Sequence, residues 1–115
     1  MTRTPEEVFA HHGQALGAGD LDDIVADFAE DAIVIGPGGA ARGKDGVRAA
    51  FTALLNDLPN ASFSLKRQVL EGDVLLLEWS ADAARTRADD GVDTFVFGDG
   101  LIRAQTVHYT LQNKG

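Results

Sequence analysis

The sequence predicts an α+β domain in which three N-terminal helices are followed by an antiparallel sheet. Two observations carry this prediction. Apolar side chains recur at helical spacing as far as Pro59, and from Ala61 onward they alternate with a period of two. Turn signals at 71–73, 90–91 and 98–100 then divide the second half of the chain into consecutive strands, which is typical of an antiparallel meander.

The first helix is predicted by its start signal. Thr4–Glu7 has the pattern of a capping box with proline at the first helical position, so the helix should run from there to Leu16. His12 falls in the middle of its apolar arc, whereas His11 lies at the edge and should reach solvent. A lone histidine on an apolar face is more often a core residue with a polar partner than a functional group, and both interpretations stay open here.

The segment Gly17–Gly39 should contain a helix stop, a capped second helix and a short strand. Its first glycines can adopt the positive φ that ends a helix, and Asp20 can cap the next one. The second helix should begin at about Leu21, and its apolar stripe reaches Phe28. The β-branched run Ile33–Ile35 favours a buried strand, which the following glycines end as a turn before the third helix.

The remaining elements follow from stop signals and alternation. A third helix should begin at Gly43 and stop before Pro59. Strands are expected from Ala61, over 74–83 and over 92–97, with a polar connection from Arg85 to Asp90, and a long last strand should cover 101–111.

The strand after residue 73 has apolar side chains on both of its faces. One face carries Leu75, Leu77 and Trp79. The other begins with Val74 and Leu76 and becomes polar toward its end, with Glu78, Ser80 and Asp82. A strand that is apolar on both sides needs both sides covered. We therefore expect a homodimer through the outer face of the sheet, with Leu75, Leu77 and Trp79 on that outer face.

Composition limits the classes of function. With 115 residues and 44% hydrophobic content, the chain should be one domain, 1–115, with a single core. It has no cysteine, which excludes thiolate chemistry and disulfides and is compatible with a cytoplasmic protein. The net charge of −8 repels phosphate backbones and anionic lipid, and no apolar run is long enough for a membrane span. A small-molecule ligand is therefore expected, and neither nucleic acid nor a membrane.

The order of elements and the wording of residues 4 to 39, including ALGAGDLDDIVADFAEDA, resemble the nuclear transport factor 2-like superfamily. By motif, the chain is most similar to ketosteroid isomerases and SnoaL-like polyketide cyclases. The resemblance implies a cystatin-like cone, in which three N-terminal helices pack on a curved, mostly antiparallel sheet around an internal pocket. It covers nearly the whole chain, but this scaffold carries several chemistries and also proteins with none.

The resemblance also implies site residues. His12 stands where the isomerases have an oxyanion-hole tyrosine, Asp93 in VDTFVF matches their second donor, and Gly36 replaces their general base. A catalytic set of His12, Asp93 and Tyr109 is expected, with His12 as a cationic partner of Asp93. Further pocket residues are expected at seven positions: Phe51, Glu78, Ser80, Asp82, Phe95, Gln105 and Val107. Of these, Glu78 and Asp82 are the substitutes considered for the missing base.

Two classes of function remain open from the sequence. The first is an isomerase, cyclase, lyase or hydrolase that acts on an apolar, oxygen-bearing substrate through a pair formed by His12 and Asp93. The second is a non-catalytic binding or dimerisation module, with His12 and Asp93 in a purely structural role. No metal, cofactor or covalent nucleophile is expected, because the histidines lack ligand spacing and no serine lies in a nucleophile turn.

Overall fold

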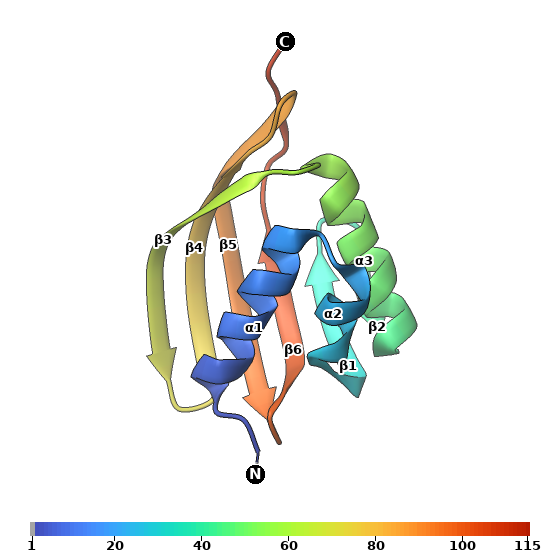
Figure 1. Ribbon diagram of the computed structural model, residues 1–115, viewed down its shortest axis with the longest axis vertical. Coiled ribbons are helices and arrows are strands. Elements are labelled where there is room, and N and C mark those ends of the chain that lie inside the picture. Colours follow the sequence, from blue (N-terminus) through green and yellow to red (C-terminus); the bar gives the residue numbers. More distant parts are fainter. Residues whose placement is uncertain (1) are drawn as a thin grey trace.

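A seven-stranded sheet curls around three helices in the computed structural model, which describes residues 2–115 (Figure 1). The helices are α1 (Pro5–Ala18), α2 (Leu21–Ala26) and α3 (Gly43–Asp57). The strands are β1 (Phe28–Gly36), β2 (Gly39–Arg42), β3 (Ser62–Glu71), β4 (Val74–Asp82), β5 (Thr86–Gly98), β6 (Leu101–His108) and β7 (Gln112–Asn113). None of the helices within residues 2–115 has the length and apolar character needed to cross a membrane.

The start signals predicted for the first two helices are confirmed. The Thr4 side chain accepts from the backbone N–H of Glu7, and the Glu7 carboxylate accepts from the N–H of Thr4. Gly19 ends α1 in the left-handed conformation with φ 64°, and the Asp20 side chain caps α2. The helix boundaries therefore follow from local chemistry, which a single sequence displays.

The second helix is shorter than its apolar stripe predicts. It ends at Ala26, and Phe28 begins strand β1 instead of a further turn of helix. Phe28 is opposite Ile102 in the parallel pair of β1 and β6, and its side chain is fully buried. Tertiary pairing thus overrides a helical spacing that only local sequence supported.

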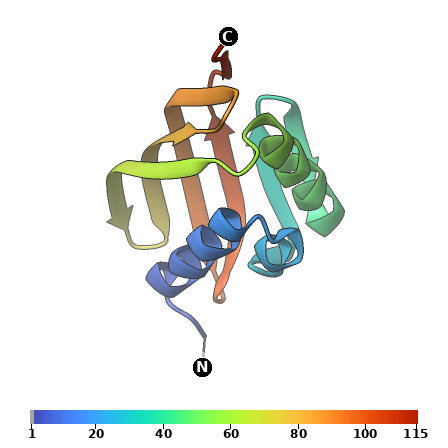
Figure 2. The same cartoon turned by 45° about the horizontal axis from the view of Figure 1, so that its top comes forward.

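The sheet is mostly antiparallel, with the strand order β2-β1-β6-β5-β4-β3 and one parallel pair, β1 with β6. Register shifts interrupt the pairings of β3 with β4, of β4 with β5 and of β5 with β6. Such irregularities bend strands and increase their twist. The sheet consequently curls, and β3 passes over the helical side of the molecule (Figure 2).

Three strand boundaries differ from the prediction. The glycine-rich turn after β1 leads first into β2, which pairs with β1 as a hairpin before α3 begins. The expected polar connection 85–90 belongs instead, from Thr86 onward, to β5, whose Thr86 and Arg87 pair with β7. The last long strand ends at His108, before the predicted end at 111. Strand β2 was missed because GAAR has no β-branched or aromatic residue, and the start of β5 was missed because residues 86–90 are mostly polar.

The helices cover only the concave face of the sheet (Figure 1). The face predicted for β4 was wrong. Leu75, Leu77 and Trp79 point into the core and are at most 5% exposed. Alternation could not decide between two apolar faces, but register does: Leu77 lies opposite Asp93 and Leu75 opposite Phe95, and residues directly opposite share a face. The prediction that Trp79 lies on the outer face and contributes to a dimer is therefore wrong.

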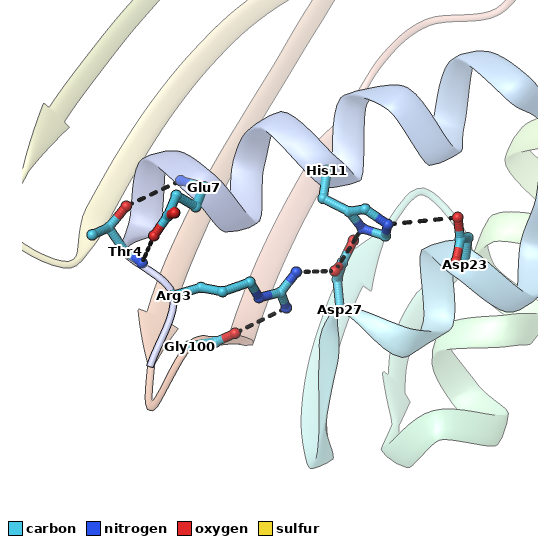
Figure 3. A network of polar contacts seen from close by, with 7 residues as sticks. All are labelled: Arg3, Thr4, Glu7, His11, Asp23, Asp27 and Gly100. Carbon is cyan, nitrogen blue, oxygen red and sulfur yellow. Dashed lines mark hydrogen bonds and ion pairs between the residues drawn. The ribbon is translucent and has the colours of Figure 1, made fainter. Parts of the chain in front are cut away.

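A buried carboxylate ties the chain's first residues to the sheet (Figure 3). Asp27 is 1% exposed, accepts from the Arg3 guanidinium at 2.9 Å, and lies 2.7 Å from His11 Nδ1. Its backbone carbonyl accepts from the N–H of Ile102 at 2.8 Å. Arg3 also donates to the carbonyl of Gly100. The expectation that His11 reaches solvent holds only in part, because one ring nitrogen is held by Asp27.

Replacing Asp27 with asparagine should destabilise the protein by about 1–3 kcal/mol, because it removes a buried charge that two cations satisfy. The hydrogen bond that the Asp27 carboxylate accepts from His11, together with its negative charge, raises the pKa of His11 above its usual 6.5. A raised pKa stabilises the folded protein below pH 6.5, and this contribution disappears as the pH rises through the folded-state value. The loss in Asp27→Asn should therefore be larger at pH 5.5 than at pH 9, measured by urea denaturation.

The matched control is Asp22→Asn, since Asp22 is 86% exposed and pairs only with Arg48. Equal losses for Asp27→Asn at the two pH values would contradict the role assigned to His11.

Candidate functional site

The concave side of the sheet encloses a cavity of about 610 Å³ between α1, α3 and strands β3 to β6. We call it the first cavity. Its lining is mostly apolar and includes Phe9, Phe63 and Phe95. The buried polar side chains that reach it are those of His12, Asp93 and Gln105, each at most 7% exposed in the protein as a whole. A mostly apolar cavity with a few convergent polar groups is typical of a small-molecule site.

Asp93 is positioned by strand β5 and by two donors. The Trp79 indole N–H donates to its Oδ1 at 2.9 Å, and the Gln105 amide donates to its Oδ2 at 3.1 Å. Burial raises the pKa of Asp93 to about 7, and the two hydrogen bonds only partly oppose this rise. A carboxyl group with this pKa is a hydrogen-bond donor in weakly acidic solution and becomes a carboxylate near neutrality.

His12 is surrounded by aromatic rings. Phe28, Phe51 and Phe95 lie edge-on to its ring, with centroid distances of 5.9, 5.5 and 5.4 Å. Burial lowers the pKa of His12 to about 4, so the imidazole is neutral at pH 7. Its Nδ1 is buried and has no hydrogen-bond partner among residues 2–115, and the same is true of Gln105 Oε1. Buried polar atoms without partners are rare and costly.

The expected pair of His12 and Asp93 does not form in the described part of the chain. Asp93 takes its hydrogen bonds from Trp79 and Gln105 instead. His12 cannot serve as the cationic partner that the sequence suggested, because desolvation keeps it neutral. The two residues nevertheless line the same cavity, as do the predicted Phe51, Phe95, Gln105 and Val107.

Trp79 is the site residue that sequence analysis placed on the wrong face. Its indole lies directly on the backbone of Gly91, where an added Cβ would fall 2.2 Å from ring carbons Cδ2 and Cε2. Only glycine leaves room for the ring at this point, which is opposite Trp79 in the pairing of β4 with β5. A glycine next to Asp90, interpreted from the sequence as a turn, was the available signal.

Three predicted pocket residues lie elsewhere. Glu78, Ser80 and Asp82 occupy the opposite face of β4 and do not line the first cavity. Asp82 is exposed and accepts from Lys114 at 2.8 Å. These three residues were predicted in the pocket because the inner and outer faces of β4 were exchanged. Side chains alternate along a strand, so one wrong choice of face misplaces all of them. The structure thus rules out Glu78 and Asp82 as bases acting inside this cavity.

Tyr109 lines a second cavity of about 510 Å³, between α3 and the β1–β2 hairpin. Its hydroxyl donates to Asp57 Oδ2 at 2.8 Å, and burial followed by this bond raises the pKa of Tyr109. The predicted convergence of Tyr109 with His12 and Asp93 in one cavity is therefore wrong. Asp57, a residue that sequence analysis did not single out, and Gly36 both line the second cavity.

No group of three or more histidine, aspartate or glutamate side chains in residues 2–115 is arranged to hold a metal ion. Position 36 is open to substitution: a Cβ there would come no closer than 3.8 Å to Val107. The site therefore offers hydrogen bonding by Asp93, Gln105 and His12 in a desolvated cavity. Among residues 2–115, Asp93 is the only carboxyl group that lines this cavity, and burial raises its pKa.

The family model of the SnoaL-like domain matches residues 9–105. The chain belongs to this family. The match confirms the resemblance on which the site prediction rested, since it covers α1 from Phe9 onward, all of the β1–α3 region and the positions of Asp93 and Gln105. A comparison with curated proteins finds no match.

Solved structures confirm the cone fold. An NTF2-like protein of unknown function from Burkholderia xenovorans is 26% identical, with a TM-score of 0.74 over 92% of this chain and 82% of that one. A candidate ketosteroid isomerase from Kribbella flavida is 16% identical, with a TM-score of 0.75 over 92% and 77%. IdmH, a candidate polyketide cyclase from Streptomyces antibioticus, is 16% identical, with a TM-score of 0.73 over 93% and 92%.

Replacing Asp93 with asparagine should change how stability depends on pH. The folded-state pKa of about 7 lies above the ordinary value of 3.8. The contribution of Asp93 to stability is therefore fully present below pH 3.8 and is lost as the pH rises through 7. Asparagine stays neutral, so Asp93→Asn should gain stability relative to the parent protein between pH 5 and pH 8.5, by an amount on the order of a few kcal/mol.

Chemical denaturation at both pH values measures the difference, with Asp82→Asn on the outer face as control. A parent-to-variant difference that does not change with pH would show that Asp93 is ionised in the fold at both values.

Proposed function

We propose that this SnoaL-like protein binds an apolar small molecule whose carbonyl or phenol oxygen lies at Asp93, Gln105 and His12 in the first cavity. The observation that carries the proposal is the pair of unsatisfied atoms, His12 Nδ1 and Gln105 Oε1, at the polar end of an apolar cavity. A phenol hydroxyl would donate to Gln105 Oε1 and accept from neutral His12 or protonated Asp93, whereas a carbonyl oxygen would only accept from the last two. The body of the ligand would contact the aromatic lining.

Protonated Asp93 and neutral His12 also suit an oxyanion, and Gln105 contributes by holding Asp93 in place. Protonated Asp93 is a donor without charge, and a donor in a desolvated cavity stabilises negative charge on a ligand oxygen more than water does. An enolate or phenolate oxygen carries that charge. Ketosteroids and polyketides, which the names of two related structures mention, have apolar bodies with carbonyl oxygens and belong to this chemical class.

The first cavity supports ligand binding better than it supports catalysis of isomerisation. Proton abstraction next to a carbonyl needs a base within reach. Glycine occupies position 36, and among residues 2–115 Asp93 is the only carboxyl group that lines the first cavity. We therefore favour binding and oxyanion stabilisation with weak isomerisation of simple ketones. A non-catalytic ligand-binding module remains the second candidate, favoured by the same lack of a base.

We also propose a homodimer through the convex face of the sheet, now with different residues from those first expected. The helices leave this face uncovered (Figure 1), and four exposed valines lie on it: Val69, Val74, Val92 and Val96. Arg67 and Glu78 are opposite each other on the same face. Charges of both signs on one patch can pair across a twofold axis.

Phenols should bind, and more acidic phenols should bind more tightly, because an ionised oxygen is the better acceptor. Asp93→Ala and Gln105→Leu should each weaken binding by roughly tenfold or more. Affinity should also fall as the pH rises past 7, where Asp93 loses its proton. Calorimetry with phenol and 4-nitrophenol tests this, with Ser80→Ala on the outer face as control.

An absorbance assay with an unsaturated ketosteroid should show slow isomerisation or none. Equal phenol affinity in all four proteins would remove the oxyanion proposal and leave the non-catalytic module. Rapid isomerisation by the parent protein would show that a base operates from outside the first cavity.

The dimer is tested by charge placed on the convex face. Val96→Lys should convert the protein to a monomer at micromolar concentration, because it puts a desolvated charge at the centre of the contact. Asn56→Lys, at an exposed position of α3 on the helical side of the molecule, is the control. Sedimentation velocity measures both, and a parent protein that is monomeric at every concentration would end this proposal.

A further inference from the structure

The first cavity has a buried end and an open end. Its three polar residues, named above, form the buried end and are at most 7% exposed. Other lining residues are exposed, among them Gly13 and Gly17 of α1 and Leu65 of β3. The cavity therefore opens to solvent between α1 and β3. We call this opening the mouth of the first cavity.

Leu65 faces the cavity and yet remains in contact with water. It lies directly opposite Trp79 in the pairing of β3 with β4, and residues directly opposite share a face. Trp79 is 4% exposed, whereas Leu65 is 51% exposed. Contact with an apolar ligand would remove the Leu65 side chain from water, which is favourable. One side of the mouth therefore offers an unused apolar contact.

The other side of the mouth has two glycines, Gly13 and Gly17, one turn apart within α1. A Cβ added at either position would meet no atom of residues 2–115 within 4 Å, the adjoining helix backbone aside. Neither glycine has a positive φ. Glycine inside a helix is less stable than alanine, and here neither packing nor backbone conformation requires it.

The buried end supplies a separate reason to expect a ligand in this cavity. His12 Nδ1 and Gln105 Oε1 are buried there without a hydrogen-bond partner among residues 2–115. His12 directly precedes Gly13 in α1. The helix that brings the unpartnered imidazole to a ligand oxygen therefore also leaves space for the rest of the ligand at the mouth.

We infer that Gly13 and Gly17 are specificity-determining residues, which keep the mouth wide enough for a substituent of the bound ligand to lie between α1 and Leu65. The ligand is held by its oxygen at the buried end, and the substituent remains partly in water. Larger side chains at these two positions would exclude it. This inference rests on the proposed function and adds the positions that limit the size of the ligand.

Calorimetry with phenol, 4-propylphenol and 4-hexylphenol tests the inference. In the parent protein, affinity should rise by roughly tenfold or more from phenol to 4-hexylphenol, because the alkyl chain leaves water at Leu65. Gly13→Leu should reduce the ratio of 4-hexylphenol to phenol affinity by roughly tenfold, because the new side chain occupies the place of the alkyl chain. Gly17→Leu should act in the same direction.

The milder variant Gly13→Ala separates specificity from folding. It should raise the midpoint of urea denaturation, because alanine is the better helix former and its methyl group meets no neighbouring residue. It should nevertheless reduce the same affinity ratio, by roughly threefold. Gln14→Leu is the matched control, since Gln14 is the next residue of α1, is exposed and does not line the cavity.

An affinity ratio that is the same in Gly13→Leu, Gln14→Leu and the parent protein would overturn the inference. A parent protein that binds 4-hexylphenol no more tightly than phenol would overturn it as well, because the chain would then have no contact at the mouth. Both results leave the proposed function in place as long as phenol binds. Absence of phenol binding would instead remove the proposed function, and the role of the glycines with it.

Discussion

The placement of the site depends on the buried contact between His11 and Asp27. A helix can rotate about its own axis as it packs, and α1 carries two adjacent histidines whose side chains point about 100° apart. The contact of His11 with Asp27 at 2.7 Å (Figure 3) fixes that rotation. His12 is thereby directed into the first cavity. Arg3 holds the same carboxylate from the other side and keeps the start of α1 beside the β5–β6 turn.

Desolvation then determines the charge state inside the cavity. It lowers the pKa of His12 to about 4 and raises that of Asp93 to about 7, so both side chains are neutral over the interval between these values. Over that interval the cavity contains no charge of its own. A neutral apolar ligand can then enter without desolvating an ion, and a charge that develops on its oxygen meets oriented donors in place of water.

Local chemistry made the helices predictable. The capping box at Thr4–Glu7, the glycine stop and the Asp20 cap act between residues close in sequence, and each appears where it was expected. The long-range pairings were less accessible. Phe28 continues a helical stripe in sequence but pairs with Ile102 in space, and β2 forms because a glycine turn brings its backbone to an exposed edge of β1.

The site shows the same division. His12, Asp93, Phe95 and Gln105 were placed in the cavity from helical phase, alternation and resemblance, and the structure places them there. Strand β4 has apolar residues on both faces, so alternation could not show which face is inside. The prediction therefore put Glu78, Ser80 and Asp82 in the cavity in place of Trp79. Asp57 was missed because it ends a helix, and no periodicity shows that Tyr109, 52 residues later, will reach it.

Helix α3 links the two halves of the molecule that sequence analysis treated separately. Its Phe51 packs against His12 and Phe28 and lines both cavities. Asp57, at the end of α3, accepts a hydrogen bond from Tyr109, the residue that follows β6. A displacement of α3 would therefore change the His12 environment and the Asp57 contact together. Phe51 and Leu54 line both the first and the second cavity. Because protein cores are close-packed, these two side chains cannot move without repacking the residues around both cavities. Occupancy of one cavity thus bears physically on the shape of the other.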